Sequence, residues 1–168
     1  FTHNILLVME LVSLLEQTPA DFSYFSVEEI DGQIGVVTSG TRPRLDSLAD
    51  LKGKINRLIQ DASTQTGETR AALIEKVYEV LRAWIEVFVE KEISAVQRYS
   101  PHISVTALDN IRVDRLPAAK AVIIPLYEKV CRCIASHSQP AQTLGIRPTL
   151  NEIKQDWQKA QDARRAYG

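Results

Sequence analysis

Residues 69–98 read TRAALIEKVYEVLRAWIEVFVEKEISAVQR, and this stretch decides the fold of the chain. At about 100° per residue, six of its apolar side chains fall within an arc of about 100°, which is typical of an amphipathic helix with one face in a core. Thr69 is suited to the N-cap, and Pro101 stands just past the expected end. The sequence therefore predicts a long helix whose core-facing stripe consists of Ile74, Val77, Leu81, Trp84, Ile85 and Phe88.

Three further segments with helical spacing surround this stretch. Residues 47–62 place their apolar side chains on one face, and residues 148–166 do so after an opening Pro-Thr pair. Residues 116–135 carry Pro117 in a first turn, where proline is tolerated, and Pro125 in the interior. This segment is therefore either one helix with a kink or two shorter helices that meet. The sequence predicts a helical domain of three to four helices.

The first forty residues follow a different pattern. Apolar residues recur with helical spacing over 5–15, and residues 21–38 form two β-rich runs around Asp31-Gly32, a strong hairpin signal. A turn-rich, basic stretch over 39–44 ends this part. We expect a mainly α (α+β) protein with a domain over 1–43 and a helical domain over 44–168. The pattern of residues 103–112 is ambiguous between a loop and a short strand.

Composition excludes several classes of protein. The chain has 168 residues, 45% of them hydrophobic, and a net charge of −1, so any nucleic-acid site must be local. No apolar run reaches the roughly 18 residues of a membrane-spanning helix, and no signal peptide is visible, which favours a cytoplasmic protein without a membrane partner. Cys131 and Cys133 stand two apart, which favours two small buried side chains over a disulfide or a metal site.

The first four residues, Phe1-Thr2-His3-Asn4, carry a resemblance to a known family. With the helix and hairpin that follow, they resemble the switch-histidine turn and closing segment of an ABC/SMC-type ATPase lobe. The resemblance implies that His3 and Asn4 sense nucleotide, because an imidazole can donate a hydrogen bond to a phosphate oxygen. The alternative is that His3 is only a polar residue in the first turn of an amphipathic helix.

Other ATPase motifs are absent from the sequence. There is no G-x-x-x-x-G-K-[ST] phosphate loop and no LSGG-like signature. We therefore expect a C-terminal portion of a longer ATPase of the DNA-repair or phage-defence type, with no cofactor of its own. The resemblance implies that ATP and Mg²⁺ are bound by a missing N-terminal lobe, and that this portion alone does not hydrolyse ATP.

A second resemblance lies in the helical part. The run Leu81-Arg82-Ala83-Trp84-Ile85-Glu86, with residues 127–132 and His137, is similar to the C-terminal region of bacterial defence ATPases related to the anticodon nucleases. There an arginine, a glutamate four residues later and a later histidine cleave RNA, and Arg82, Glu86 and His137 match in type and order. A metal-independent ribonuclease needs a base, an acid and a cation for the phosphate. The resemblance implies these roles for the three residues.

Arg132 and His137 also read R-x-x-x-x-H, the spacing of HEPN-type helical ribonucleases. Residues five apart on a helix lie about 140° from each other, so these two converge only if the helix ends between them or a second subunit contributes. A homodimer and an RNA (tRNA) or DNA partner are therefore expected. The alternative is that the same helices form a non-catalytic dimerisation or partner-docking module of the ATPase, with a solvated charged face on the long helix.

Overall fold

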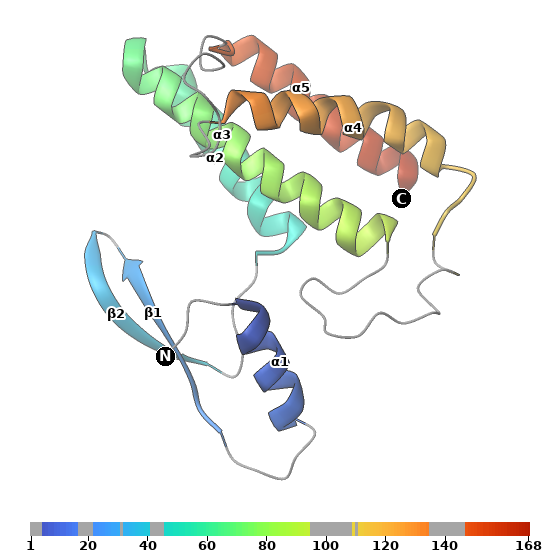
Figure 1. Cartoon of the computed structure of the whole chain (residues 1–168). Coiled ribbons are helices and arrows are strands. Elements are labelled where there is room, and N and C mark those ends of the chain that lie inside the picture. The colour runs from blue at the N-terminus through green and yellow to red at the C-terminus, as the bar shows by residue number, and fades with distance from the viewer. Residues whose placement is uncertain are drawn as a thin grey trace. The chain divides into compact units, whose positions relative to one another are not determined.

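The structure, a computed structural model, describes residues 5–16, 22–30, 32–40, 46–94, 109, 111–134 and 147–168. These residues fall into two compact units, one up to residue 40 and one from residue 46. The chain is mainly α-helical with a two-stranded antiparallel hairpin, as the sequence predicted (Figure 1). The elements are α1 (Ile5–Glu16), β1 (Tyr24–Ile30), β2 (Gln33–Gly40), α2 (Leu48–Thr64), α3 (Gly67–Phe88), the π-helical turn η1 (Val89–Ile93), α4 (Leu116–Cys133) and α5 (Leu150–Tyr167).

The first unit contains the predicted helix α1 and the predicted hairpin. Val27 pairs with Val37, and Glu28 pairs with Val36, after which the register shifts by one residue. Gly35 is the extra residue of this bulge and has a φ of 87°, a conformation that favours glycine. Four apolar side chains of the hairpin remain exposed, namely Phe25 at 60%, Val27 at 48%, Ile34 at 84% and Val37 at 62%.

Helix α3 is the centre of the second unit. It packs against α2, α4 and α5, and all six residues of its predicted stripe are buried. Tyr78 and Val87, which lie beside the stripe, are also fully buried. The indole ring of Trp84 stacks on Phe88 at 5.6 Å and meets the edge of Trp157 at 5.1 Å. A helix with neighbours on several sides needs a wider apolar face than the sequence pattern alone indicated.

The start of α3 differs from the prediction. Thr69 is not the N-cap but lies inside the helix, which begins at Gly67 after the N-cap residue Thr66. Gly67 has a φ of 59°, so it can turn the chain where a larger residue would be strained. The Arg70 side chain donates to the carbonyls of Ala62 and Gln65, at 3.1 and 2.6 Å. These bonds tie the start of α3 to the end of α2 and leave a link of only two residues.

The end of the long helix also differs. The α-helix stops at Phe88 and continues as the π-helical turn η1, in which Ser94 N donates to Val89 O at 2.8 Å. Helix α4 passes through Pro125 as a single element, and its end at Cys133 falls between Arg132 and the position of His137. None of the described helices is both long enough and apolar enough to cross a membrane.

Candidate functional site

Arg82 and Glu86 occupy the face of α3 that meets α4. Arg82 Nε donates to Glu86 Oε1 at 2.9 Å, which is the ion pair expected from their spacing of four residues. Tyr127 reaches across from α4 and donates its hydroxyl to the same oxygen, also at 2.9 Å. A cation, a carboxylate and a phenol from two helices therefore meet at one point, which we call the Glu86 cluster (Arg82, Glu86 and Tyr127).

The hydrogen bonds to Glu86 shift the pKa of both donors of the Glu86 cluster in the same direction. The hydrogen bond to Glu86 raises the pKa of Arg82, with a further contribution from Tyr127. Burial raises the pKa of Tyr127, and its hydrogen bond to Glu86 acts in the same direction. Both donors therefore keep their protons at neutral pH. The cluster can bind an anion through Arg82 and offer a carboxylate oxygen as a proton acceptor, which are two of the three functions that RNA cleavage needs.

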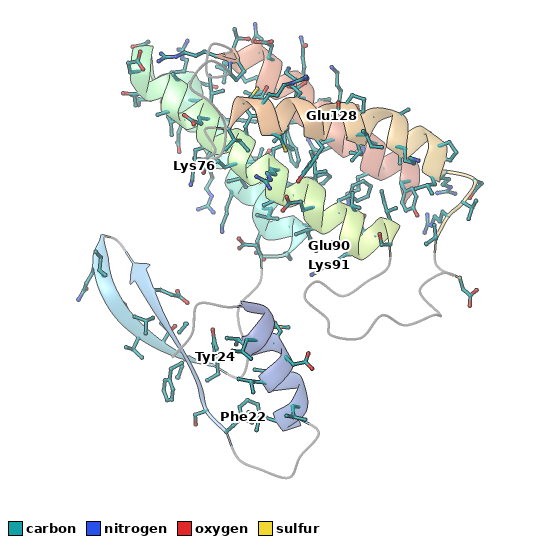
Figure 2. The ribbon with its side chains drawn as sticks, viewed as in Figure 1. Phe22, Tyr24, Lys76, Glu90, Lys91 and Glu128 are labelled. Carbon is teal, nitrogen blue, oxygen red and sulfur yellow. The ribbon has the colours of Figure 1, made fainter. Side chains whose placement is uncertain are left out.

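A cavity of about 400 Å³ opens beside this cluster, between α3 and α4. Its wall is largely apolar, with Ile85, Val89 and Ile123 among its residues, and carboxylates stand at its edge. Figure 2 shows two of these, Glu90 near the end of the α3 segment and Glu128 on α4. The cavity is therefore suited to an apolar ligand group that carries positive charge where it meets these carboxylates.

Arg132 stands apart from the Glu86 cluster. It is exposed on α4, about 140° around the helix from Tyr127, and forms no hydrogen bond or ion pair with another described residue. His3, Asn4 and His137 lie outside the described residues. The structure thus brings Arg82 and Glu86 together, gives Arg132 a different face of α4, and leaves the roles of all six predicted residues as predictions.

Tyr127 is the functional candidate that sequence reasoning missed. It belongs to the run 127–132 that carried the resemblance, but nothing in that run indicates which residue its hydroxyl would contact. Its contact with Glu86 spans 41 residues of sequence. The one hint in the sequence is the tyrosine hydroxyl itself, because a half-buried tyrosine needs a hydrogen-bond partner.

Within the described part of the chain, no group of three or more His, Cys, Asp and Glu side chains is placed to hold a metal ion. Cys131 and Cys133 are free thiols, each half-buried on α4. Comparisons of the chain with protein-family models, with curated proteins and with solved structures find no match.

Proposed function

We propose that this chain is the C-terminal portion of an SMC/ABC-like ATPase of the DNA-repair or phage-defence type, and that its helical unit cleaves RNA without a metal ion. The observation that carries the proposal is the Glu86 cluster. Two residues that the sequence resemblance put forward, Arg82 and Glu86, share one hydrogen-bonded site that is open enough for a ligand, since their side chains are 45% and 29% exposed.

The proposed reaction uses the ribose 2′-hydroxyl as the nucleophile. Glu86 takes the proton of this hydroxyl, the 2′-oxygen bonds to phosphorus, and the bond from phosphorus to the 5′-oxygen breaks. Arg82 binds the phosphate while its charge develops. His137 supplies the proton of the leaving 5′-oxygen in this scheme, as the resemblance implies. Tyr127 is a positioning residue, because its hydrogen bond fixes the carboxylate of Glu86.

The first unit supports the ATPase part of the proposal. A hairpin of two strands is at best marginally stable by itself, so the exposed Phe25, Val27 and Val37 favour packing against further structure. An ATPase lobe supplies such a surface. In this proposal the lobe binds ATP and Mg²⁺, His3 and Asn4 respond to the γ-phosphate, and the helical unit is switched by the nucleotide state.

A second function is favoured by the cavity beside the Glu86 cluster. Ile124 is 48% exposed at this cavity, and Val122 is 36% exposed on the same helix. An apolar wall edged by Glu90 and Glu128 fits an amphipathic helix that carries basic residues. In this alternative the helical unit docks a partner of the ATPase or a second copy of the chain, and the Arg82–Glu86 pair is structural.

Cleavage of a tRNA pool by the full-length ATPase, with ATP and Mg²⁺ present, tests the first proposal. We expect Glu86→Gln to lower the cleavage rate by about 100-fold or more, because it removes the proton acceptor. Tyr127→Phe should lower it less, since the carboxylate stays in place. The matched control is Lys76→Ala, which removes an exposed ion pair with Glu79 from the same helix. It should leave cleavage unchanged.

The same variants separate the two functions. If Glu86→Gln cleaves RNA at the rate of the unsubstituted protein, the nuclease proposal is wrong. An Ile124→Glu substitution then tests docking, because a charge placed in the apolar wall should release the partner or dissociate the dimer. Sedimentation of the full-length protein measures this release. A protein that keeps its assembly state with Ile124→Glu would contradict the docking function.

A further inference from the structure

A second and larger cleft lies on a different face of the helical unit. Its volume is about 860 Å³, and residues of α2, α3, η1 and α5 line it. Trp84 contributes to it from α3, about 160° around the helix from both Arg82 and Glu86. The cleft is therefore separate from the Glu86 cluster.

Basic side chains dominate the lining of this cleft. Five lining residues are basic, namely Lys52, Lys91, Arg112, Arg164 and Arg165, and one, Glu92, is acidic. They come from segments far apart in the sequence, so the fold gathers them. An excess of basic over acidic side chains along one cleft favours an anionic ligand.

The three arginines form contacts with other residues. Arg164 makes a bidentate pair with Glu92, at 2.8 and 2.6 Å, and Arg165 pairs with Asp162. Arg112 donates to the carbonyl of Tyr167 at 3.0 Å, at the end of α5. The part-buried contacts of Arg164 and Arg112 hold these two guanidinium groups on the wall of the cleft before any ligand arrives, which lowers the entropic cost of binding. Arg165 is 71% exposed and stays mobile.

The two lysines are in a different state. Lys52 on α2 and Lys91 on η1 are exposed, and neither forms an ion pair with another described residue. Figure 2 shows Lys91 next to Glu90 near the end of the α3 segment. Two ammonium groups are therefore available to an anion at the opening of the cleft, since a lysine binds phosphate as a mobile point charge.

Polar groups that suit a larger ligand lie between these charges. Gln158 and Gln161 of α5 line the cleft and can donate and accept hydrogen bonds. Trp84 is 1% exposed, and its indole N–H has no acceptor among the described residues. A buried indole N–H is normally hydrogen-bonded, so an acceptor atom of a ligand seated against Trp84 would complete its bonding after a small side-chain shift.

We propose that this cleft binds a phosphate-bearing ligand of nucleotide size. Fixed arginines and mobile lysines match the charge of phosphate groups, and the two glutamines match the hydrogen-bonding groups of a base or sugar. The volume lies within the roughly 300–1,000 Å³ of sites for small ligands. The proposal does not depend on RNA cleavage, because none of its residues belongs to the Glu86 cluster.

Isothermal titration of the full chain tests the proposal, with ATP, inorganic triphosphate and a short RNA oligonucleotide as three separate probes. We expect the double substitution Lys52→Gln/Lys91→Gln to weaken binding by about tenfold or more, the equivalent of one lost charge-assisted hydrogen bond. The matched control is Lys76→Gln/Lys120→Gln, which removes the same charge from exposed positions outside the cleft. Its affinity should equal that of the unsubstituted chain.

The three probes identify the source of the phosphate. Binding of ATP above that of triphosphate supports a free nucleotide, and binding of the oligonucleotide alone supports a phosphodiester within RNA. A Trp84→Phe variant keeps an aromatic ring and removes the N–H donor, so it should weaken binding without loss of helical circular dichroism. The proposal is overturned if no probe binds, or if the cleft and control double variants bind equally well.

Discussion

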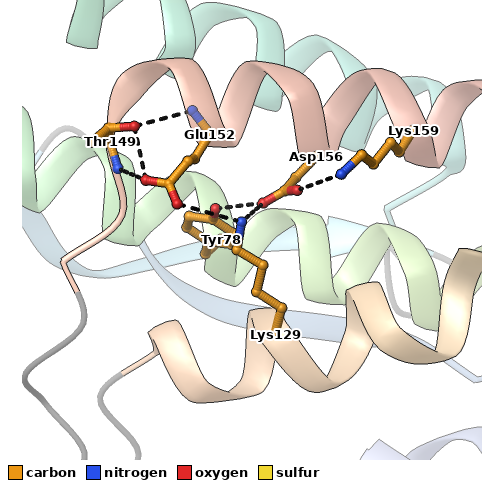
Figure 3. Close-up of polar contacts among 6 residues, drawn as sticks. All are labelled: Tyr78, Lys129, Thr149, Glu152, Asp156 and Lys159. Carbon is orange, nitrogen blue, oxygen red and sulfur yellow. Dashed lines mark hydrogen bonds and ion pairs between the residues drawn. The ribbon is translucent and has the colours of Figure 1, made fainter.

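The Tyr78 hydroxyl donates a hydrogen bond of 2.8 Å to Asp156 Oδ2 and thereby joins α3 to α5 (Figure 3). Lys129 of α4 binds the same oxygen at 2.6 Å. Asp156 is 3% exposed and is the buried charged residue of the described core. Burial, together with the bond to Asp156, raises the pKa of Tyr78, so its hydroxyl stays a donor. Three helices of the bundle thus meet at one carboxylate.

Removing one member of this group should destabilise the protein most where a buried polar group is left without a hydrogen-bond partner. We expect Asp156→Ala to lower the free energy of unfolding by about 1–3 kcal/mol, because the fully buried Tyr78 hydroxyl loses its acceptor, whereas Lys129 keeps Glu152 at 3.9 Å. Tyr78→Phe should cost about 1–2 kcal/mol, since Lys129 still satisfies the carboxylate. Equilibrium urea unfolding, followed by circular dichroism, measures both values.

Lys159 provides the control for this prediction. Its Nζ lies 3.9 Å from Asp156 Oδ1, but its side chain is 63% exposed. Lys159→Ala should therefore change the free energy of unfolding by less than about 1 kcal/mol. A double-mutant cycle on Tyr78 and Asp156 measures the interaction free energy between these two side chains. Additive effects of the two substitutions would show that the hydrogen bond is not a stabilising contact.

The helical architecture could be read from the sequence because its signals are local. Ser47 accepts from the backbone N–H of Asp50, and Asp50 in turn accepts from the backbone of Ser47, which is the capping box at the start of α2. The stripe of α3 predicted the core-facing side of that helix. Asp31-Gly32 predicted the hairpin turn, and Gly32 has a φ of 79°. Each signal spans only a few residues.

The contacts between helices could not be read in the same way. Asp156 stands one position before Trp157 and three after Ile153, so helical periodicity places a charge within an apolar stripe. Its main partner Tyr78 is 78 residues away. Nothing in either local pattern connects the two. The Glu86 cluster is similar, since Arg82 and Glu86 stand four residues apart on one helix, and only the packing of α4 on α3 adds Tyr127.

Cys133 should react slowly with alkylating reagents in the folded protein. Its burial raises the pKa of the thiol, and the thiolate is the reactive form. A Cys131→Ser variant isolates Cys133, and iodoacetamide labelling at pH 8 followed by intact mass measures its rate. We expect labelling several-fold slower than for the same variant in urea, where burial is lost. Equal rates in the folded and unfolded protein would contradict this.

The start of α5 should make the stability of the helical unit depend on pH. Glu152 accepts hydrogen bonds from the backbone N–H and the hydroxyl of Thr149, at 2.7 and 2.8 Å. The backbone bond is the larger cause, and together they lower the pKa of Glu152. A carboxylate with a lowered folded pKa stabilises the protein above its unfolded pKa of about 4.3, and this stabilisation is lost as the pH falls through the folded pKa.

Replacing Glu152 with glutamine should flatten this dependence. The amide oxygen can still accept from Thr149, but it does not titrate, so the unfolding temperature should fall less between pH 7 and pH 3 than in the unsubstituted chain. The two proteins should differ most at neutral pH and converge in acid, because the charged carboxylate accepts these hydrogen bonds more strongly than the protonated acid or the amide. Calorimetry at intervals of pH measures the two curves. A Glu128→Gln variant, which removes a carboxylate from the exposed face of α4, is the control. If the unfolding temperature of Glu152→Gln falls with pH in parallel with that of the unsubstituted chain, another group causes the loss of stability in acid.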